Sequence, residues 1–168
     1  MSFIKFLKVS NQDLGSTDIS DFETTNNLIL PPDYKSFLTE TNGGVPINPY
    51  IGLYPIDKKY GIEESPNEIE IDSFLSINSL QETLDNLRLY TYSQDSPLPL
   101  TKNANSKLED YLKQNLVPIA ESYNDLIFID TGGLYYGNIF YNNYDFGYLN
   151  IASSFSKLLE ICYKNSKE

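Results

Sequence analysis

Residues 30–44 read Leu30-Pro31-Pro32-Asp33-Tyr34-Lys35-Ser36-Phe37-Leu38-Thr39-Glu40-Thr41-Asn42-Gly43-Gly44, and this stretch specifies one helix with both of its ends. Proline is tolerated in the first helical turn, and Asp33 places a negative charge at the positive end of the helix dipole, so the helix is predicted to begin near Pro32. Asn42 and Gly43 favour the left-handed backbone that ends helices. The spacing i, i+3, i+4, i+7 predicts one buried face, made of Tyr34, Phe37, Leu38 and Thr41.

Patterns on both sides of this helix predict further helices and strands. A short amphipathic helix is expected to end near Asn26, with cap candidates at 16–18. The proline-rich stretch 45–56 is expected to be loop or edge strand, because each proline removes a ladder donor. Strict alternation over 68–72, continuing to 77, predicts a half-buried strand, and leucine spacing predicts a helix over 79–92.

The second half of the chain is predicted to contain most of the sheet. Beyond a polar loop at 93–106, a helix is expected over 107–114. A short strand at 116–121 precedes an apolar run at 126–130 that suggests a strand covered on both faces. Residues Thr131 to Leu134 are expected to close a hairpin onto 136–141, since both glycines accept positive φ. A terminal helix is expected over 151–163, capped by Ser153 or Ser154. Helices, then strands, then a helix indicate an α+β fold with a mostly antiparallel or mixed central sheet flanked by N-terminal and C-terminal helices.

Length and composition indicate a small protein of the cytoplasm. A chain of 168 residues is expected to form a single domain over residues 1–168 with a substantial core. The single Cys162 cannot form an internal disulfide, and no zinc-type ligand spacing occurs. The N-terminus lacks a secretion signal and no run reaches the length of a membrane span, so neither export nor insertion is expected.

The charge of the chain limits its partners. Twelve Lys and Arg against 23 Asp and Glu give a net charge of −11. Nucleic acid and anionic membranes would be repelled, whereas a basic protein would be attracted. Between Asp57 and Asp85, eight acids face two lysines, so a net charge of −6 is concentrated there.

Several classes of chemistry lack their usual residues. The chain has no histidine, which removes the most common general acid and base, the usual catalytic triads and the most common metal ligand. The Gly132-Gly133 pair is no phosphate loop, and the stretch 142–145 lacks the spacing of an EF-hand. No cofactor or metal is therefore expected.

The acidic strand has three interpretations. Glu68, Glu70 and Asp72 would project from one face about 6 to 7 Å apart, so they cannot all face an apolar core. They could form a solvated face, a docking surface for a basic partner, or half of a glycosidase-like pair. The last would require an opposing carboxylate across a cleft, which the sequence does not supply.

Aromatic residues crowd the segment 135–148. Tyrosine combines large area with a polar tip and is favoured at interfaces, so an exposed subset would form a protein-binding patch. Phe140 and one neighbour are expected in the core.

Four segments together resemble the SUKH superfamily, the SMI/KNR-like proteins that bacteria use widely as immunity proteins. Residues 30–46 resemble its LPxDYxxFLxxxNGGxP motif, and 116–121 resemble its xPIA(D/E) strand entry. Residues 137–141 resemble its GxVYxW strand, and 151–159 its xAxSFxxFL helix. The chain departs from the family in having Tyr141-Asn142-Asn143 where a strand often carries Trp and His. Tyr123-Asn124 stands where a glycine pair is common in the family. These departures argue against carrying over any ligand-binding role of the family residues at those positions, but not against the fold.

The resemblance implies an α+β domain with a sheet flanked by helices, no catalytic apparatus, and action by binding a toxin, often a nuclease or deaminase. The hypothesis is an immunity protein that neutralises a cognate bacterial toxin, a basic one, through an acidic, tyrosine-bearing surface. A non-catalytic scaffold or regulatory module and a small carboxylate-based hydrolase remain as alternatives. The expected contact residues are Glu63, Glu64, Glu68, Glu70, Asp72, Tyr135, Tyr144 and Asp145.

Overall fold

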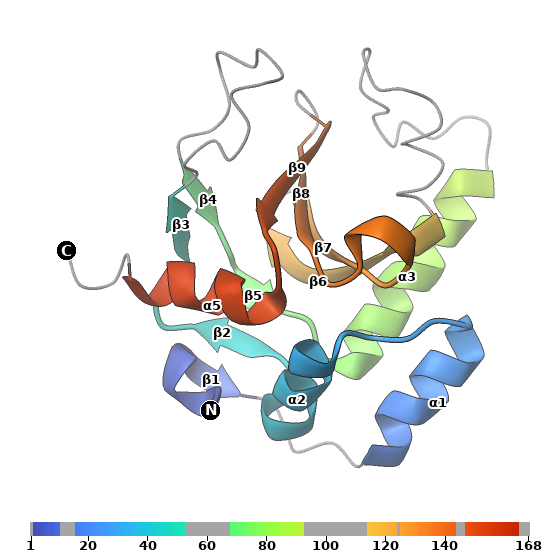
Figure 1. The fold of residues 1–168 in the computed structure, drawn as a ribbon, viewed down its shortest axis with the longest axis horizontal. Helices are drawn as coiled ribbons and strands as arrows, with labels where there is room; N and C mark the ends of the chain where they lie inside the picture. Colours follow the sequence, from blue (N-terminus) through green and yellow to red (C-terminus); the bar gives the residue numbers. More distant parts are fainter. Residues whose placement is uncertain are drawn as a thin grey trace.

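The computed structural model describes residues 2–10, 16–52, 68–92, 114–123, 125–143 and 147–164, and shows an α+β fold (Figure 1). Its helices are η1 (Ile4–Phe6), α1 (Ser16–Asn26), α2 (Pro32–Thr41), α3 (Ile77–Tyr92), η3 (Gly133–Tyr135) and α5 (Phe155–Lys164). Its strands are β1 (Leu7–Ser10), β2 (Gly44–Pro46), β3 (Tyr50–Gly52), β4 (Glu68–Glu70), β5 (Ser73–Phe74), β6 (Leu116–Ser122), β7 (Asp125–Asp130), β8 (Ile139–Asn143) and β9 (Gly147–Ala152).

The strands form an antiparallel sheet of seven and a smaller sheet of two. The order in the larger sheet is β1-β2-β5-β6-β7-β8-β9, and β3 pairs with β4 in the smaller one. The two sheets are joined, because the Ile71 amide donates to the Pro49 carbonyl at 2.7 Å and the Asp72 amide donates to the Glu121 carbonyl at 2.9 Å. The segment 68–74 therefore passes from β3 on one side to β6 on the other.

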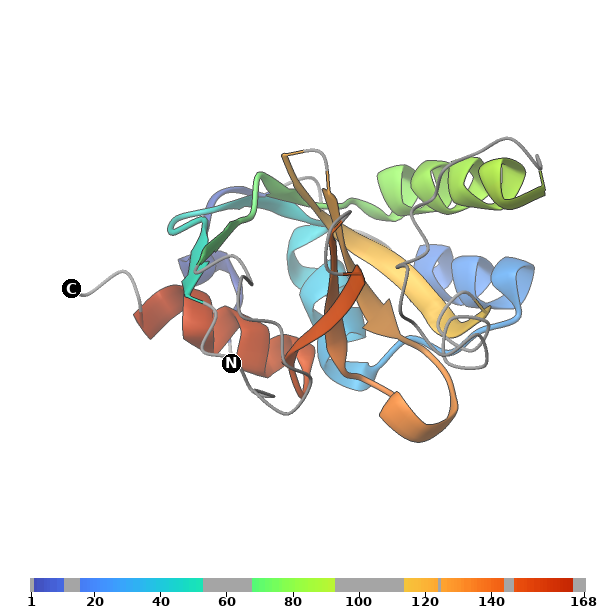
Figure 2. The same cartoon turned by 90° about the horizontal axis from the view of Figure 1, so that it is seen from above.

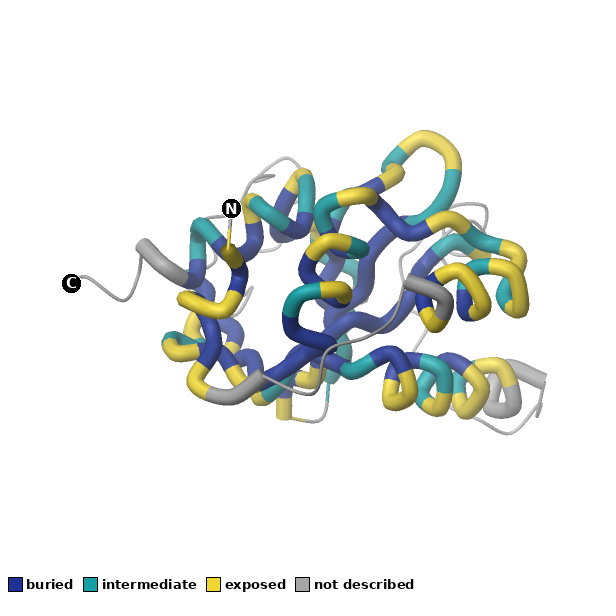
Figure 3. Tube along the Cα trace, turned by 90° about the horizontal axis from the view of Figure 1, so that it is seen from below, coloured by how far each residue is buried: buried dark blue, intermediate teal, exposed yellow. Residues whose placement is uncertain are grey.

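The central helix α2 has the bounds and the buried face that the sequence predicts. Tyr34, Phe37, Leu38 and Thr41 are all buried. The Phe37 ring lies 4.7 Å from that of Phe155 and 5.4 Å from that of Phe74, measured between ring centroids. Helix α2 thus packs on both α5 and the sheet, and dark-blue buried segments run through this centre in Figure 3.

The end of α2 also fixes the start of α3. Asn42 adopts the left-handed conformation, with φ of 46°, and its Oδ1 accepts a hydrogen bond from the Ile77 amide at 2.9 Å. The sequence predicts the helix end, whereas the long-range bond is a finding of the structure. Asn42 therefore terminates one helix and caps another.

Helices α1 and α3 lie side by side, away from α5 (Figure 2). The Asn26 side chain bridges them, because its Nδ2 donates to Gln81 at 2.7 Å and its Oδ1 accepts from Arg88 at 2.7 Å. Ile19 and Phe22 on α1 and Leu80 and Leu84 on α3 are buried, as their helical spacing predicts.

The sheet has apolar residues on both faces at β7, as predicted. Ile127 and Ile129 belong to the main core, whereas Phe128 packs in a second cluster with Leu116 and Phe140. Tyr141, the neighbour of Phe140, is buried in the main core. The two predicted core aromatics of this segment are therefore confirmed, on opposite faces.

Three sequence predictions about strands and loops are wrong in detail. The expected strand 68–77 is divided into β4 and β5, and α3 begins at Ile77. Strand β2 lies between β1 and β5 rather than at an edge; only Gly44 of β2 is paired with β5, so Pro46 needs no amide on that side. The connection between β7 and β8 is longer than the predicted tetrad and contains η3.

At the C-terminal end, Ile151 and Ala152 of the predicted segment belong to β9, and the last helix begins at Phe155, directly after the predicted cap residue Ser154. Its capping by Ser154 is confirmed, because the Ser154 hydroxyl accepts from the Lys157 amide at 3.2 Å. The helix predicted over 107–114 and the loop at 93–106 lie outside the described residues, apart from Gln114.

Candidate partner-binding surface

Strands β3 and β4 form a small platform with one buried and one exposed side. Ile51 and Ile69 point into the main core, whereas Tyr50, Glu68 and Glu70 are exposed. The alternation of apolar and polar residues produces this division, because successive side chains in a strand point to opposite faces. The platform lies above α5 in the view of Figure 1.

We use the term acidic face for the exposed residues Tyr50, Glu68, Glu70 and Asp72. Tyr50 lies opposite Glu70 in the antiparallel register, and Glu68 lies opposite Gly52, which has no side chain. The Glu70 charge, together with smaller effects of desolvation, a hydrogen bond to Glu70 and the Glu68 charge, raises the pKa of the Tyr50 hydroxyl. The tyrosine at this position therefore stays neutral and can donate to a carboxylate.

Asp72 is fixed beside the turn that joins β6 and β7. Its Oδ2 accepts a hydrogen bond from the Tyr123 amide at 2.6 Å. Its own amide is bonded to the Glu121 carbonyl, so both the backbone and the side chain of Asp72 are held by β6 and the following turn. The acidic face consequently extends from the β3–β4 platform to the larger sheet.

The carboxylates of the acidic face have no cation beside them within the described part of the chain. Ion pairs there join Lys35 to Glu23, Arg88 to Asp85 and Lys157 to Glu160, at 3.1, 3.8 and 2.6 Å. None of these pairs involves the acidic face. Glu68, Glu70 and Asp72 are all exposed to solvent.

The structure brings together only part of the residue set predicted from sequence. Glu68, Glu70 and Asp72 are exposed on one continuous segment, as expected. Tyr135 is half-buried, and its ring packs on that of Phe140 with centroids 6.1 Å apart. It lies in η3, beyond the Asp130 end of β7, whereas Asp72 adjoins the turn at the Asp125 end. Glu63, Glu64, Tyr144 and Asp145 lie outside the described residues.

Two exposed tyrosines beside the carboxylates were not in the predicted set. Tyr50 lies in the proline-rich stretch that sequence reasoning assigned to loop or edge strand, and its pairing with Glu70 is a long-range contact. Tyr123 occupies the position where the resemblance noted a departure from a glycine pair. That departure was the available signal, because an aromatic residue in place of glycine exposes a side chain at a turn.

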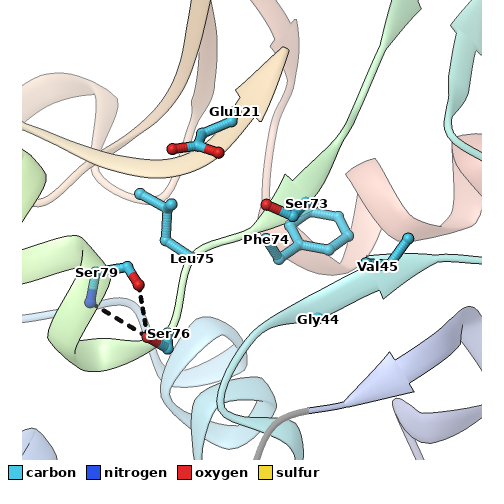
Figure 4. A pocket seen from close by; sticks show the side chains of 8 residues that line it. All are labelled: Gly44, Val45, Ser73, Phe74, Leu75, Ser76, Ser79 and Glu121. Atoms are coloured by element: carbon cyan, nitrogen blue, oxygen red, sulfur yellow. Dashed lines mark hydrogen bonds between the residues drawn. The ribbon is translucent and has the colours of Figure 1, made fainter. Parts of the chain in front are cut away.

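A separate hollow of about 220 Å³ lies between β2, β5, β6 and the start of α3 (Figure 4). Its polar lining includes Ser76 and Ser79, whose hydroxyls are 2.9 Å apart, and the Ser76 hydroxyl also accepts from the Ser79 amide. These groups satisfy each other as the N-terminal cap of α3. The hydroxyls of Ser76 and Ser79 are therefore occupied by helix capping, while Glu121, which also lines the hollow, is exposed and accepts from the Asp72 amide through its backbone carbonyl.

A metal site and a membrane-spanning helix each have requirements that the described residues do not meet. They contain no group of three or more His, Cys, Asp or Glu side chains placed to hold a metal ion. Among the helices in these ranges, none has both the length and the apolar composition needed to cross a lipid bilayer.

The fold is that of an α+β protein, and its surface carries the exposed acidic face. The chain belongs to the SMI1 / KNR4 family (SUKH-1), whose family model matches residues 14–161. This family is known for immunity proteins; its members typically bind toxin partners and are generally non-catalytic. A comparison with individual curated proteins gives no match.

Proposed function

We propose that this protein is a cytoplasmic immunity protein, acting as a single domain, that binds and neutralises a cognate bacterial toxin through the acidic face. The observation that carries the proposal is the exposed row of Glu68, Glu70 and Asp72, which has no cation beside it in the described structure and rests on the buried Ile51 and Ile69. A surface of this kind is pre-organised, because the strand residues beneath it are fixed in the core. Little ordering is then required when a partner binds.

The charge of the chain favours a basic toxin, such as one that acts on nucleic acid. A net charge of −11 accelerates encounter with a positively charged protein and repels nucleic acid itself. A nuclease grips its substrate with Lys and Arg on the surface that faces the phosphates. An acidic protein bound to that surface would exclude the substrate without any chemistry of its own.

The arrangement of the carboxylates supports binding over hydrolysis. Glu68 and Glu70 lie two residues apart on the same side of β4 and face solvent. A carboxylate-based hydrolase places its two acids on opposite sides of the scissile bond. Side by side on one exposed strand face, these two glutamates are placed to contact a partner protein instead.

The proposal is tested with the protein that the wild-type chain captures from its native cells and with a charge-reversed variant. Glu68→Lys with Glu70→Lys changes the net charge by +4; Asp72 is left intact because it holds the turn at Tyr123. The matched control is Asp21→Lys with Glu82→Lys, which makes the same charge change at exposed positions on α1 and α3. Binding is measured by calorimetry at low and high salt, and protection by growth of cells expressing the captured protein.

We expect the wild type to restore growth and the acidic-face variant to bind at least about 10-fold more weakly at low salt, with a smaller salt dependence. The control variant should bind within about 3-fold of wild type, since long-range charge alone alters affinity little. Equal affinities of the two variants would remove the acidic face from the interface. A captured partner that is harmless to cells would instead favour a scaffold or regulatory role.

A further inference from the structure

Tyr123 is the most exposed large side chain named in the described structure, with 89% of its surface accessible. It lies in the turn between β6 and β7, directly after the buried Ser122. Burying the ring in the core would remove its apolar surface from water, yet the structure leaves the ring outside. The ring is therefore accessible to a partner over almost its whole surface.

The backbone at Tyr123 has a conformation that a tyrosine rarely adopts. Its φ is +55°, in the left-handed region, where a bulky side chain crowds the backbone and glycine does not. The Asp72 carboxylate offsets part of this strain, because its Oδ2 accepts from the Tyr123 amide at 2.6 Å. The turn thus keeps an aromatic residue at a position that a glycine would occupy without strain.

Tyr123 lies at one end of the acidic face. Tyr50 is paired with Glu70 across β3 and β4, Asp72 follows two residues later, and Asp72 holds Tyr123. Two residues of extended chain span about 6 to 7 Å, so the two carboxylates lie between the two tyrosines. Glu70 therefore has Tyr50 as its cross-strand neighbour, and Asp72 is hydrogen-bonded to the backbone amide of Tyr123.

We propose that Tyr123 and Asp72 form a subsite for an arginine side chain of a basic protein partner. The guanidinium would stack on the exposed ring, and it would donate to Asp72 Oδ1, which has no donor among the described residues. Planar guanidinium groups stack on aromatic rings and bond carboxylates at the same time, which a lysine ammonium does less well. Tyrosine is also among the residues that contribute most to interface energies.

The identification of the partner as a toxin rests on the proposed function, whereas the chemistry of the subsite can be tested without any toxin. The probe is N-acetyl-arginine amide, titrated into the full-length protein and followed by amide and tyrosine-ring NMR signals. N-acetyl-citrulline amide, which has similar shape and no charge, is the matched ligand. The variants are Tyr123→Gly, which removes the ring and relieves the backbone strain, and Asp72→Asn, which removes the charge but retains an acceptor for the Tyr123 amide. Leu134→Ala is the control at another exposed apolar position.

We expect shifts centred on Tyr123 and Asp72 that grow with the arginine amide up to concentrations on the order of tens of millimolar, because an exposed ion pair and an exposed cation–π contact are each weak, and no such shifts with the citrulline amide. Both site variants should lose these shifts, the Leu134 variant should retain them, and the melting temperature of Tyr123→Gly should be no lower than that of wild type. Equal shifts with the uncharged amide, shifts that persist in Tyr123→Gly, or no localised shift would overturn the subsite. If the arginine amide binds here but the acidic-face variant of the previous subsection binds its partner normally, the subsite stands and the proposed interface falls.

Discussion

The side chain of Asp33, in the first turn of α2, accepts a hydrogen bond from the backbone amide of Ser156, in the first turn of α5, at 2.8 Å. The other carboxylate oxygen accepts from the Tyr34 amide at 3.0 Å. Because the Ser154 hydroxyl accepts from the next amide of α5, that of Lys157, two unpaired donors at this helix end are satisfied from different parts of the chain. The aspartate of the first family-like motif therefore caps the helix of the last one.

Removal of this cap should destabilise the protein without altering the acidic face. Asp33→Ala leaves the Ser156 and Tyr34 amides without their acceptor, and we expect the free energy of unfolding to fall by about 1 to 2 kcal/mol, as for other lost helix caps. The measurement is urea denaturation followed by circular dichroism. Asp33→Asn is the control: it keeps one acceptor oxygen and should lose less. A urea denaturation midpoint for Asp33→Ala equal to that of wild type would show that the hydrogen bond from Ser156 to Asp33 does not contribute to stability.

Asp33 and Asn42 illustrate what the sequence predicts and what it cannot. The bounds of α2 follow from the proline, the aspartate and the left-handed Asn42, because these signals act within one or two turns of the chain. That the same two side chains also bond Ser156 and Ile77 depends on contacts 123 and 35 residues away, which no local pattern encodes.

The same distinction applies to the candidate site. Alternation along 68–72 predicts which glutamates are exposed, since side chains repeat every second residue of a strand. Tyr50 and Tyr123 were missed because both reach the acidic face through long-range contacts. Tyr50 pairs with Glu70 across two strands, and the backbone amide of Tyr123 donates a hydrogen bond to Asp72. The β3–β4 platform was missed for a related reason: strand partners are set by the whole fold.

Glu40, on the last turn of α2, should make the attachment of the N-terminal segment dependent on pH. A hydrogen bond from the Ser2 hydroxyl, followed by the bond from the Phe3 amide at 3.0 Å, lowers the pKa of the Glu40 carboxyl from its ordinary value of 4.5. A lowered pKa means that the folded state favours the charged form. The stabilisation is therefore present above pH 4.5 and is lost as the pH falls through the lowered value.

The check on Glu40 is its side-chain titration by carbon NMR. In Ser2→Ala the pKa of Glu40 should rise toward 4.5, because the largest cause of the shift is removed. Ser36→Ala is the matched control, since the Ser36 hydroxyl donates to the Pro32 carbonyl on the same helix and is not among the groups whose hydrogen bonds lower the Glu40 pKa. An unchanged pKa of Glu40 in Ser2→Ala would contradict the conclusion that the Ser2 hydroxyl is the main cause of the lowered pKa.

Tyr34 carries a hydroxyl that the core does not use. The side chain is fully buried, its hydroxyl has no hydrogen-bond partner among the described residues, and burial raises its pKa. Leaving such a group unsatisfied costs about 1 to 3 kcal/mol, so Tyr34→Phe should leave stability unchanged or raise it by about 1 kcal/mol. Tyr34→Leu should lower it, because the ring lies 4.9 Å from that of Phe155. Chemical denaturation of both variants decides the matter, and a loss above about 1 kcal/mol for Tyr34→Phe would mean that the hydroxyl has a partner.

Gly43 and Gly137 form a natural pair for separating backbone strain from steric exclusion. Their φ angles are +83° and +87°, so alanine at either position takes the same left-handed backbone, at a cost of about 1 to 2 kcal/mol. A Cβ on Gly137 would lie 3.9 Å from Pro31, an ordinary contact, whereas a Cβ on Gly43 would lie 2.6 Å from the Phe74 carbonyl oxygen. The second contact cannot be relieved by a side-chain rotation, because that atom belongs to the backbone of β5.

Gly43→Ala should therefore lower the free energy of unfolding by about 1 to 3 kcal/mol more than Gly137→Ala, the typical cost of forcing an extra methyl group into a packed site. Urea denaturation of the two variants measures the difference directly, because the strain common to both cancels. Equal losses would mean that the approach of Gly43 to β5 is not required. A larger loss at Gly43 would show that the close approach of this glycine to the β5 backbone, next to the pairing of Gly44 with Phe74, contributes to stability.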